Sequence, residues 1–441
     1  MITILVCKIL RFLGSLLGRG SSLPGTIALK LDKNILSKLT LPEKTLAITG
    51  SNGKTSVTEL VRAAAKASGM RVVCNSYGSN QIEGVVTALL TASNLRGVVN
   101  ADAVILESDE RFCQYTFSHF SPKYILVTNL YRDQLTRNGH NGFVLGELRK
   151  GLPTDSRLIL NTDDPVSATL AENRDGAIYF GVDSQQLRED ENARHAYDDG
   201  AYCPRCKTPL RYEWHVENHL GNYECVKCGY RRTQPDHSVT SSDGSVFVID
   251  GEYRITPQIP NRMFAYNIAA AFTASVEALG IAPEVAAAAL DGHSLANGRI
   301  LNFDVNGHPG LFLLSKHENS MAYNGALETI SSSPSDELSV VLIVDLLSRK
   351  YVANDMSWLW DIDFERLADG RIKRIFIGGL FANDVAARLL FAGVPDNRLI
   401  VKPNLDELMA ALYEQAVGNI YTLTCFTDAP KFTKRLKGAA V

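Results

Sequence analysis

The chain has 441 residues, of which 45% are hydrophobic and 21% are charged, and its formal net charge is -3 at pH 7. A single hydrophobic core stops growing at roughly 250–300 residues, so we expect two or three domains. The composition is that of an ordinary globular protein, which excludes disordered and fibrous classes. The nearly neutral charge gives no general attraction for nucleic acid, and we expect no nucleic-acid partner.

The first twenty residues are apolar, but Lys8, Arg11 and Arg19 interrupt them. A spanning helix needs about 18 apolar residues in a row, and a secretory signal needs a basic start and a small-residue cleavage site. We therefore expect a cytoplasmic protein in which residues 1–40 form an N-terminal segment with a helix packed on the body. The alternative is an interfacial helix in peripheral contact with the inner face of the membrane.

From about residue 44, short aliphatic runs alternate with amphipathic stretches, which is typical of parallel strands joined by crossover helices. The predicted strands are TLAITG, RVVCNS, AVILES, YILVTNL and RLILN. Between about Asp183 and Pro257 the chain becomes polar and contains two close cysteine pairs, which indicates an inserted module. An alanine-rich helix then ends at Gly280 and completes a central domain, residues 41–299.

Residues 300–441 contain a second series of strands and helices. LFLLSK, SVVLIVD, RIFIGG and NIYTLTCF are the predicted strands, with DVAARLLFAG and LDELMAALYEQAV as helices between them. The predicted fold class is therefore α/β, with a central P-loop domain built on a parallel sheet and a smaller Rossmann-like α/β domain at the C-terminus.

A glycine turn joins the first strand of the central domain to a helix, in the order Gly50, Ser51, Asn52, Gly53, Lys54, Thr55, Ser56. Such a turn presents backbone N–H groups and a helix N-terminus to phosphates. Lys54 would add a positive charge on the outer phosphates, and the Thr55 hydroxyl would bind Mg²⁺. The spacing differs from the common Gly-x-x-x-x-Gly-Lys because Ile48 stands where the first glycine would be.

The strand AVILES ends in Glu107, so a carboxylate follows a buried strand at the sheet edge where open α/β sheets bind ligands. Mg²⁺ prefers one or two carboxylates together with phosphate oxygens and water, which makes Glu107 a candidate ligand. The alternative is a helix cap. Polar clusters also follow the next two strands, NLYRDQ and NTDD, and together they outline a nucleotide cleft.

Four cysteines form two Cys-x-x-Cys pairs separated by 18 residues: Cys203, Cys206, Cys225 and Cys228. This spacing predicts a structural Zn²⁺ ribbon within residues 200–232, in which four thiolates close a tetrahedral site. Disulfides or a redox pair are the alternative. Arg231 and Arg232 beside the second pair could contact nucleic acid, but we expect them on a solvated face.

The segments TGSNGKTS, LESDE, TNLYRDQL and NTDDP resemble the Mur ligase family, which also includes folylpolyglutamate synthases. Within it, the opening RGSSLPGTIALKL, the four-cysteine insertion, RDQL and NDMSWLWDIDFE are similar to the MurT branch. Members of that branch are ligase subunits of lipid II isoglutaminyl synthase and pair with a GatD-type glutaminase. The resemblance covers nearly the whole chain.

This resemblance implies that ATP phosphorylates the α-carboxylate of D-glutamate in lipid II, and that ammonia from the glutaminase then replaces phosphate to leave D-isoglutamine. It implies catalytic roles for Lys54 and Glu107 and places Asn267 and Arg299 near the nucleotide. It also implies that a C-terminal aspartate completes the partner's Cys-His pair. Asp355 is the first choice and Asp361 the second. The alternative for Asp355 is an exposed helix cap.

The acceptor half departs from the family pattern. Where the family has Lys-Asn-Pro-x-Gly-Phe-Asn-Gln, this chain reads KHENSMAYNG from Lys316; Leu301 replaces the glutamate of Gly-Arg-x-Glu, and LLSRKYVAND replaces an Asn-Asp-Asn and Ala-Asp-Gly stretch. A changed carboxylate substrate is therefore an open alternative. Two others are a free-standing ligase that adds an amino acid without a glutaminase, and an ATP-regulated binding module that uses the zinc ribbon.

Overall fold

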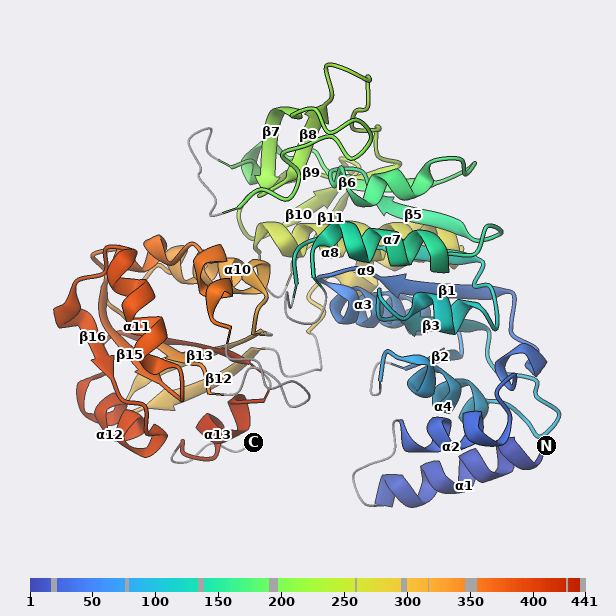
Figure 1. Cartoon of the computed structure of the whole chain (residues 1–441), viewed down its shortest axis with the longest axis horizontal. Coiled ribbons are helices and arrows are strands. Elements are labelled where there is room, and N and C mark those ends of the chain that lie inside the picture. The colour runs from blue at the N-terminus through green and yellow to red at the C-terminus, as the bar shows by residue number, and fades with distance from the viewer. Residues whose placement is uncertain are drawn as a thin grey trace. The chain divides into compact units, whose positions relative to one another are not determined.

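The computed structural model describes residues 1–16, 22–75, 79–133, 139–189, 197–257, 260–294, 300–315, 317–345, 355–425 and 427–436 (Figure 1). The chain divides into two compact units. Unit 1 contains Met1–Tyr131, His140–Ala193 and Asp198–Leu295, and unit 2 contains Arg132–Gly139, Arg194–Tyr197 and Ala296–Val441. Among the described residues, no helix is both long and apolar enough to cross a bilayer.

A nine-stranded sheet forms the centre of unit 1, in the order β11-β10-β9-β6-β5-β4-β1-β3-β2. All neighbours from β2 to β9 are parallel, and β9, β10 and β11 pair antiparallel. The strands are β1 (Lys44–Thr49), β2 (Val72–Cys74), β3 (Ala103–Glu107), β4 (Tyr124–Val127), β5 (Arg157–Asn161), β6 (Ile178–Val182), β9 (His237–Ser242), β10 (Phe247–Ile249) and β11 (Tyr253–Ile255). The five strands predicted from aliphatic runs are β1 to β5. Because β1 lies between β3 and β4, the carboxyl ends of these three strands share one edge.

Helices cover both faces of this sheet (Figure 1). They are α1 (Ile2–Leu16), α2 (Leu23–Leu31), α3 (Lys54–Ala67), α4 (Ile82–Ala92), α5 (Cys113–Phe117), α7 (Asn141–Gly151), α8 (Arg262–Thr273) and α9 (Pro283–Leu290). The N-terminal helix α1 packs on the body as expected, since Ile4 and Cys7 are buried in one cluster with Ala28 of α2 and Leu89 of α4.

The inserted module is smaller than the sequence suggested. We expected it to span residues 183–257, but β9, β10 and β11 belong to the main sheet. Among the described residues of this stretch, β7 (Arg211–Glu217), β8 (Leu220–Glu224) and the two cysteine turns stand apart, with β7 and β8 as a two-stranded sheet. The error has a physical cause, because β9 reads HSVTSS and buries serine and valine without a continuous aliphatic run.

Unit 2 contains a six-stranded sheet in the order β12-β13-β17-β14-β15-β16, parallel except for β12. Its strands are β12 (Ile300–Val305), β13 (His308–Ser315), β14 (Leu338–Ile343), β15 (Ile372–Gly378), β16 (Leu399–Val401) and β17 (Asn419–Cys425). Its helices are α10 (Ser320–Ser331), α11 (Ala382–Phe391), α12 (Leu405–Gln415) and α13 (Ala429–Thr433). Two apolar clusters, one containing Val340 and the other Val341, hold these helices against the sheet.

Candidate active site

The glycine turn between β1 and α3 is closely surrounded. Gly50 and Gly53 have φ values of 125° and 83°, which side-chain-bearing residues rarely adopt. A Cβ on Gly50 would lie 2.3 Å from Thr128 Oγ1, and a Cβ on Gly53 would lie 2.2 Å from Asn267 Oδ1. The helix α8 therefore brings Asn267 against the turn. Arg299, the other residue expected there, lies outside the described residues.

The carboxyl end of β4 holds this turn in shape. Asn52 donates its backbone N–H to Asn129 Oδ1 at 3.0 Å, and the Thr128 hydroxyl donates to the Asn52 carbonyl at 2.6 Å. Ser51 Oγ donates to the Tyr131 carbonyl and accepts from the Tyr131 N–H, both at 3.0 Å. The polar cluster that we predicted as the rim of a cleft thus fixes the backbone of the glycine turn.

Lys54 is buried in the turn with a carboxylate partner. Its Nζ donates to the carbonyls of Gly50 and Ser51 and lies 2.9 Å from Glu110 Oε2. The side chains of Lys54 and Glu110 are each only 5% exposed. Glu110 is the last residue of the LESDE segment, and the sequence predicted no role for it. The burial of its partner lysine could not be read from the sequence.

Glu107 ends β3 beside the same turn. In the parallel register it is paired with Ile48 of β1, two residues before Gly50. Its Oε1 accepts a hydrogen bond from Asn80 Nδ2 at 3.2 Å, and its backbone N–H donates to Asn75 Oδ1 at 2.8 Å. The residue is 8% exposed. A buried carboxylate on the strand next to β1 and the Thr55 hydroxyl in the first turn of α3 are oxygen donors of the kind that Mg²⁺ prefers.

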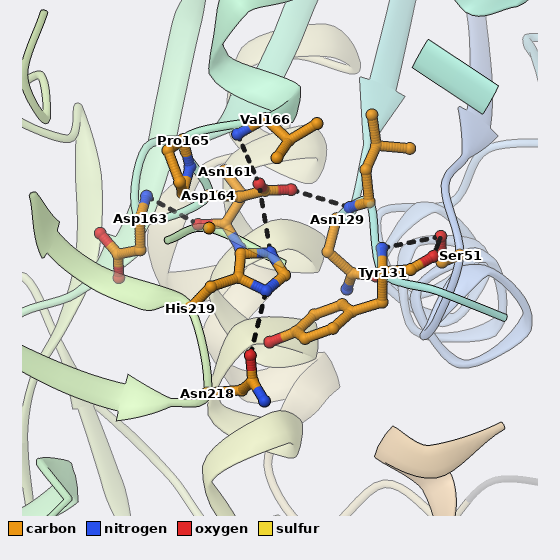
Figure 2. A network of polar contacts seen from close by, with 12 residues as sticks. Ser51, Asn129, Tyr131, Asn161, Asp163, Asp164, Pro165, Val166, Asn218 and His219 are labelled. Atoms are coloured by element: carbon orange, nitrogen blue, oxygen red, sulfur yellow. Dashed lines mark hydrogen bonds and ion pairs between the residues drawn. The ribbon is translucent and has the colours of Figure 1, made fainter. Parts of the chain in front are cut away.

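A buried Asp164–His219 pair lies next to the residues that hold the turn (Figure 2). Asp164 accepts the backbone N–H groups of Leu130 and Val166, both at 2.8 Å. His219 Nε2 lies 3.5 Å from Asp164 Oδ1, and the His219 ring is 4.2 Å from the ring of Tyr131. The β7–β8 hairpin therefore inserts His219 beside β4, a contact that no sequence signal predicted.

The two groups of this pair shift each other's pKa. Burial alone would lower the pKa of His219, but the Asp164 carboxylate outweighs burial and raises it. Burial alone would raise the pKa of Asp164, but hydrogen bonds from His219 and the N–H of Leu130 outweigh it and lower this pKa. Both charged forms are thus favoured in the folded protein.

Arg232 does not lie on a solvated face, contrary to our expectation. Its side chain is 7% exposed and forms ion pairs with Asp163 at 2.6 Å and Asp183 at 2.9 Å. Asp163 is fully buried and also accepts a hydrogen bond from the Tyr266 hydroxyl at 2.8 Å. A buried carboxylate needs a charged partner, and Arg232 supplies it. Arg231, in contrast, is exposed.

The four cysteines of the insertion come together in two matching turns. Cys203 Sγ lies 3.6 Å from Cys228 Sγ, and Cys206 Sγ lies 3.4 Å from Cys225 Sγ. In both turns the fifth residue has a positive φ and donates its N–H to the carbonyl of the first cysteine: Lys207 (61°) to Cys203, and Gly229 (70°) to Cys225. All four sulfur atoms lie within 4.8 Å of one another. This donor set fits one tetrahedral Zn²⁺ ion.

The two candidate aspartates of unit 2 have different surroundings. Asp355 is exposed and accepts the N–H of Ser357 at 2.9 Å, at the start of the 3₁₀ turn Ser357–Asp361. Asp361 ends the same turn, is 18% exposed and lies 3.3 Å from the Arg132 guanidinium. Only Asp355 of these two therefore presents its carboxylate to solvent.

Taken together, β1, the glycine turn, Lys54 and the acidic end of β3 define a P-loop domain of the nucleotide-dependent class. Residues 48–275 match the Mur ligase middle domain, and residues 316–428 match the MurT ligase C-terminal domain. The chain therefore belongs to the Mur ligase family, in its MurT branch. This family uses ATP and Mg²⁺, and the chain is an ATP-dependent ligase.

Individual relatives agree with this assignment. The chain is 32% identical over 439 residues to the Streptococcus pneumoniae lipid II isoglutaminyl synthase (glutamine-hydrolyzing) subunit MurT, covering 96% of this chain and 94% of that one. The Staphylococcus aureus subunit of the same name is 28% identical over 85% of this chain and 84% of its own. The solved structure of a pseudomurein peptide ligase type C from Methanothermus fervidus shares the fold, with a TM-score of 0.67 at 20% identity over 91% of this chain and 79% of that one.

Proposed function

We propose that this chain activates the α-carboxylate of D-glutamate in lipid II for amidation. A carboxylate oxygen attacks the γ-phosphorus of ATP and forms an acyl phosphate, and ADP leaves. Ammonia from a GatD-like glutaminase partner then attacks the carbonyl carbon, phosphate leaves with the bonding electrons, and the nitrogen loses a proton. The observation that best supports this proposal is the glycine turn, which contains Lys54 and has Asn267 directly beside Gly53. The names of the relatives support the choice of substrate and partner.

The roles of the site residues follow from charge. A carboxylate is a poor acyl donor, and phosphorylation gives it a good leaving group. During the transfer, negative charge builds up on the phosphoryl group and has to be neutralised by the site. The backbone N–H groups of residues 53–56, at the N-terminus of α3, face the phosphates, and Lys54 neutralises the outer ones. Thr55 and Glu107 hold Mg²⁺. Asn267 lies directly beside Gly53 and so next to the proposed nucleotide site.

The four-cysteine cluster in this proposal holds a structural Zn²⁺. Four thiolates leave no position for water or substrate, so the ion contributes to folding and not to the reaction. It orders the hairpin that carries His219 and hence the packing against Tyr131.

A glutaminase docks on unit 2 near Asp355. Apolar side chains are exposed around the end of the Ser357–Asp361 turn: Trp360 is 52% exposed, and Phe391, whose ring lies 5.3 Å from it, is 77% exposed. Exposed neighbouring aromatic residues are typical of protein interfaces. In this arrangement Asp355 orients the partner's catalytic histidine, as the third member of a triad does.

The protein works at the cytoplasmic face of the membrane, where α1 touches lipid. Six large apolar residues repeat along one face of this helix and are at least 47% exposed: Ile2, Leu5, Ile9, Phe12, Leu13 and Leu16. The first acidic residue of the chain is Asp32, whereas Lys8, Arg11 and Arg19 are basic. An exposed apolar face on a basic segment is typical of a helix that binds an anionic lipid surface.

Hydroxylamine trapping tests the central step. Hydroxylamine attacks an acyl phosphate and leaves a stable hydroxamate, so lipid II, ATP and Mg²⁺ should give lipid II hydroxamate and ADP in equal amounts. Lys54→Met should give neither. ADP formation that is independent of lipid II, or the absence of hydroxamate, would contradict the proposal and direct attention to other carboxylates.

A further inference from the structure

Three side chains that are distant in the sequence meet at the carboxyl edge of the sheet in unit 2. Cys425 is the last residue of β17 and is paired in register with Ser315, the last residue of β13. His317 follows β13 by two residues, and Asp428 precedes α13. His317, Cys425 and Asp428 are 3%, 5% and 0% exposed. One donor atom from each lies within 4.8 Å of the other two, and His317 Nε2 is 3.1 Å from Asp428 Oδ2.

Further contacts orient two of these donors. The other ring nitrogen of the imidazole, His317 Nδ1, lies 3.1 Å from the Tyr323 hydroxyl. Asp428 Oδ1 accepts from Lys431 Nζ at 2.9 Å, and Asp428 Oδ2 accepts from the backbone N–H of Asp345 at 2.9 Å. Lys431 is also paired with Asp345. Hydrogen bonds to the ligands are typical of metal centres, where they fix ring orientation and carboxylate position.

We propose that His317, Cys425 and Asp428 bind a Zn²⁺ ion, separate from the four-cysteine cluster. Imidazole nitrogen, thiolate and carboxylate are the three ligand types of zinc, and bond lengths of about 2.0–2.3 Å place the ligands of a tetrahedral ion about 3.3–3.8 Å apart. The 3.1 Å separation of His317 Nε2 and Asp428 Oδ2 is close to that range. A small adjustment of the three side chains therefore encloses the ion.

The ligand count distinguishes this site from the ribbon. Three protein ligands leave a fourth position for water or a small oxygen ligand, which is the arrangement of reactive zinc sites. The site lies at the edge of the sheet where open α/β folds bind ligands. The inference does not depend on lipid II or on the glutaminase.

Metal content tests this inference directly. The full chain is purified without chelator and zinc per chain is measured by mass spectrometry for the wild type, Cys425→Ser, His317→Gln and the control Cys74→Ser. Cys74 is a half-buried cysteine outside both clusters. The site predicts that Cys425→Ser and His317→Gln each contain one zinc fewer than the wild type, while Cys74→Ser retains the wild-type content. The expected difference is one zinc ion per chain, whether or not the four-cysteine cluster also contains zinc.

Cobalt substitution provides a second readout. Co²⁺ bound to Cys425 should give a thiolate charge-transfer band that Cys425→Ser loses, while the stronger band of the four-cysteine cluster is unchanged. Thermal unfolding confirms that each variant is folded. Equal zinc content in the wild type and both variants, together with an unchanged cobalt spectrum, would overturn the site and leave a metal-free hydrogen-bonded cluster.

Discussion

Lys54 and Glu110 form an ion pair at 2.9 Å in the interior of the phosphate-binding turn, with each side chain 5% exposed. An unpaired buried charge is costly, and the two buried groups compensate each other's charge. The pair links the end of β3 to the first turn of α3.

Lys54→Met should abolish ATP binding and lower the free energy of unfolding by about 3–5 kcal/mol, because it removes the cation that is paired with the buried Glu110 carboxylate. The double variant Lys54→Met/Glu110→Gln removes both charges and should recover most of that stability without recovering ATP binding. Urea unfolding and titration calorimetry measure the two quantities. If the double variant were as unstable as the single one, the charge of Glu110 would not be the cause.

Gly53→Ala should weaken ATP binding by more than about tenfold, because its Cβ would displace the Asn267 amide and strain a φ of 83°. Gly69 is a matched control just beyond the other end of α3, since it has the same φ of 83° and a Cβ added to it would meet nothing within 4 Å. Gly69→Ala should cost about 1–2 kcal/mol of stability and leave ATP affinity unchanged. Equal ATP affinities in the two variants would refute a role for the Asn267 contact.

The Asp164–His219 pair predicts a pH window of stability. The pKa of His219 is raised from 6.5, so its contribution is complete below pH 6.5 and is lost as the pH rises through the folded-state pKa. The pKa of Asp164 is lowered from 3.8, so its contribution is present above pH 3.8 and is lost as the pH falls through its folded-state value. The stability difference between the wild type and His219→Gln should therefore be largest between about pH 4 and 6.5. Urea unfolding from pH 4 to 9 measures it, and a difference that does not change with pH would argue against an ionised pair.

Two exposed phenylalanines separate the proposed surfaces. Phe12 on α1 is 64% exposed, and Phe391 at the end of α11 is 77% exposed. Phe12→Glu should prevent sedimentation with phosphatidylglycerol vesicles and leave glutaminase binding intact, since it places a charge on the lipid-facing surface. Phe391→Glu should have the opposite effect. The surfaces would be wrongly assigned if one variant lost both vesicle binding and glutaminase binding, or if neither variant lost either of them.

The sequence was most informative where a signal is local. Continuous aliphatic runs predicted β1 to β5, and the order of Gly50, Gly53 and Lys54 predicted a glycine turn that leads from β1 into a helix. Short or polar strands gave no such signal, so β9 was assigned to the insertion and the three-residue β16 was missed. Which residues of β9 are buried depends on the strands and helices that pack against it, and these neighbours are set by the tertiary structure.

Contacts between distant segments could not be predicted in this way. His317 and Asp428 are 111 residues apart, and only the parallel pairing of β13 with β17 brings them together. The same applies to His219, which reaches Asp164 because a hairpin folds back on the sheet edge. The sequence identified the altered loop at His317 as a departure from its family, but not the residues that surround it.

Amidation in the presence of the partner tests the central claim most directly. The chain is co-expressed with a class I glutaminase, and conversion of lipid II is measured by mass spectrometry with glutamine or with ammonium chloride as the nitrogen source. We predict ATP-dependent amidation with both sources for the wild type and for Asp361→Asn, and with ammonium chloride alone for Asp355→Asn. ATP binding without any amidation of lipid II from either source would contradict the account.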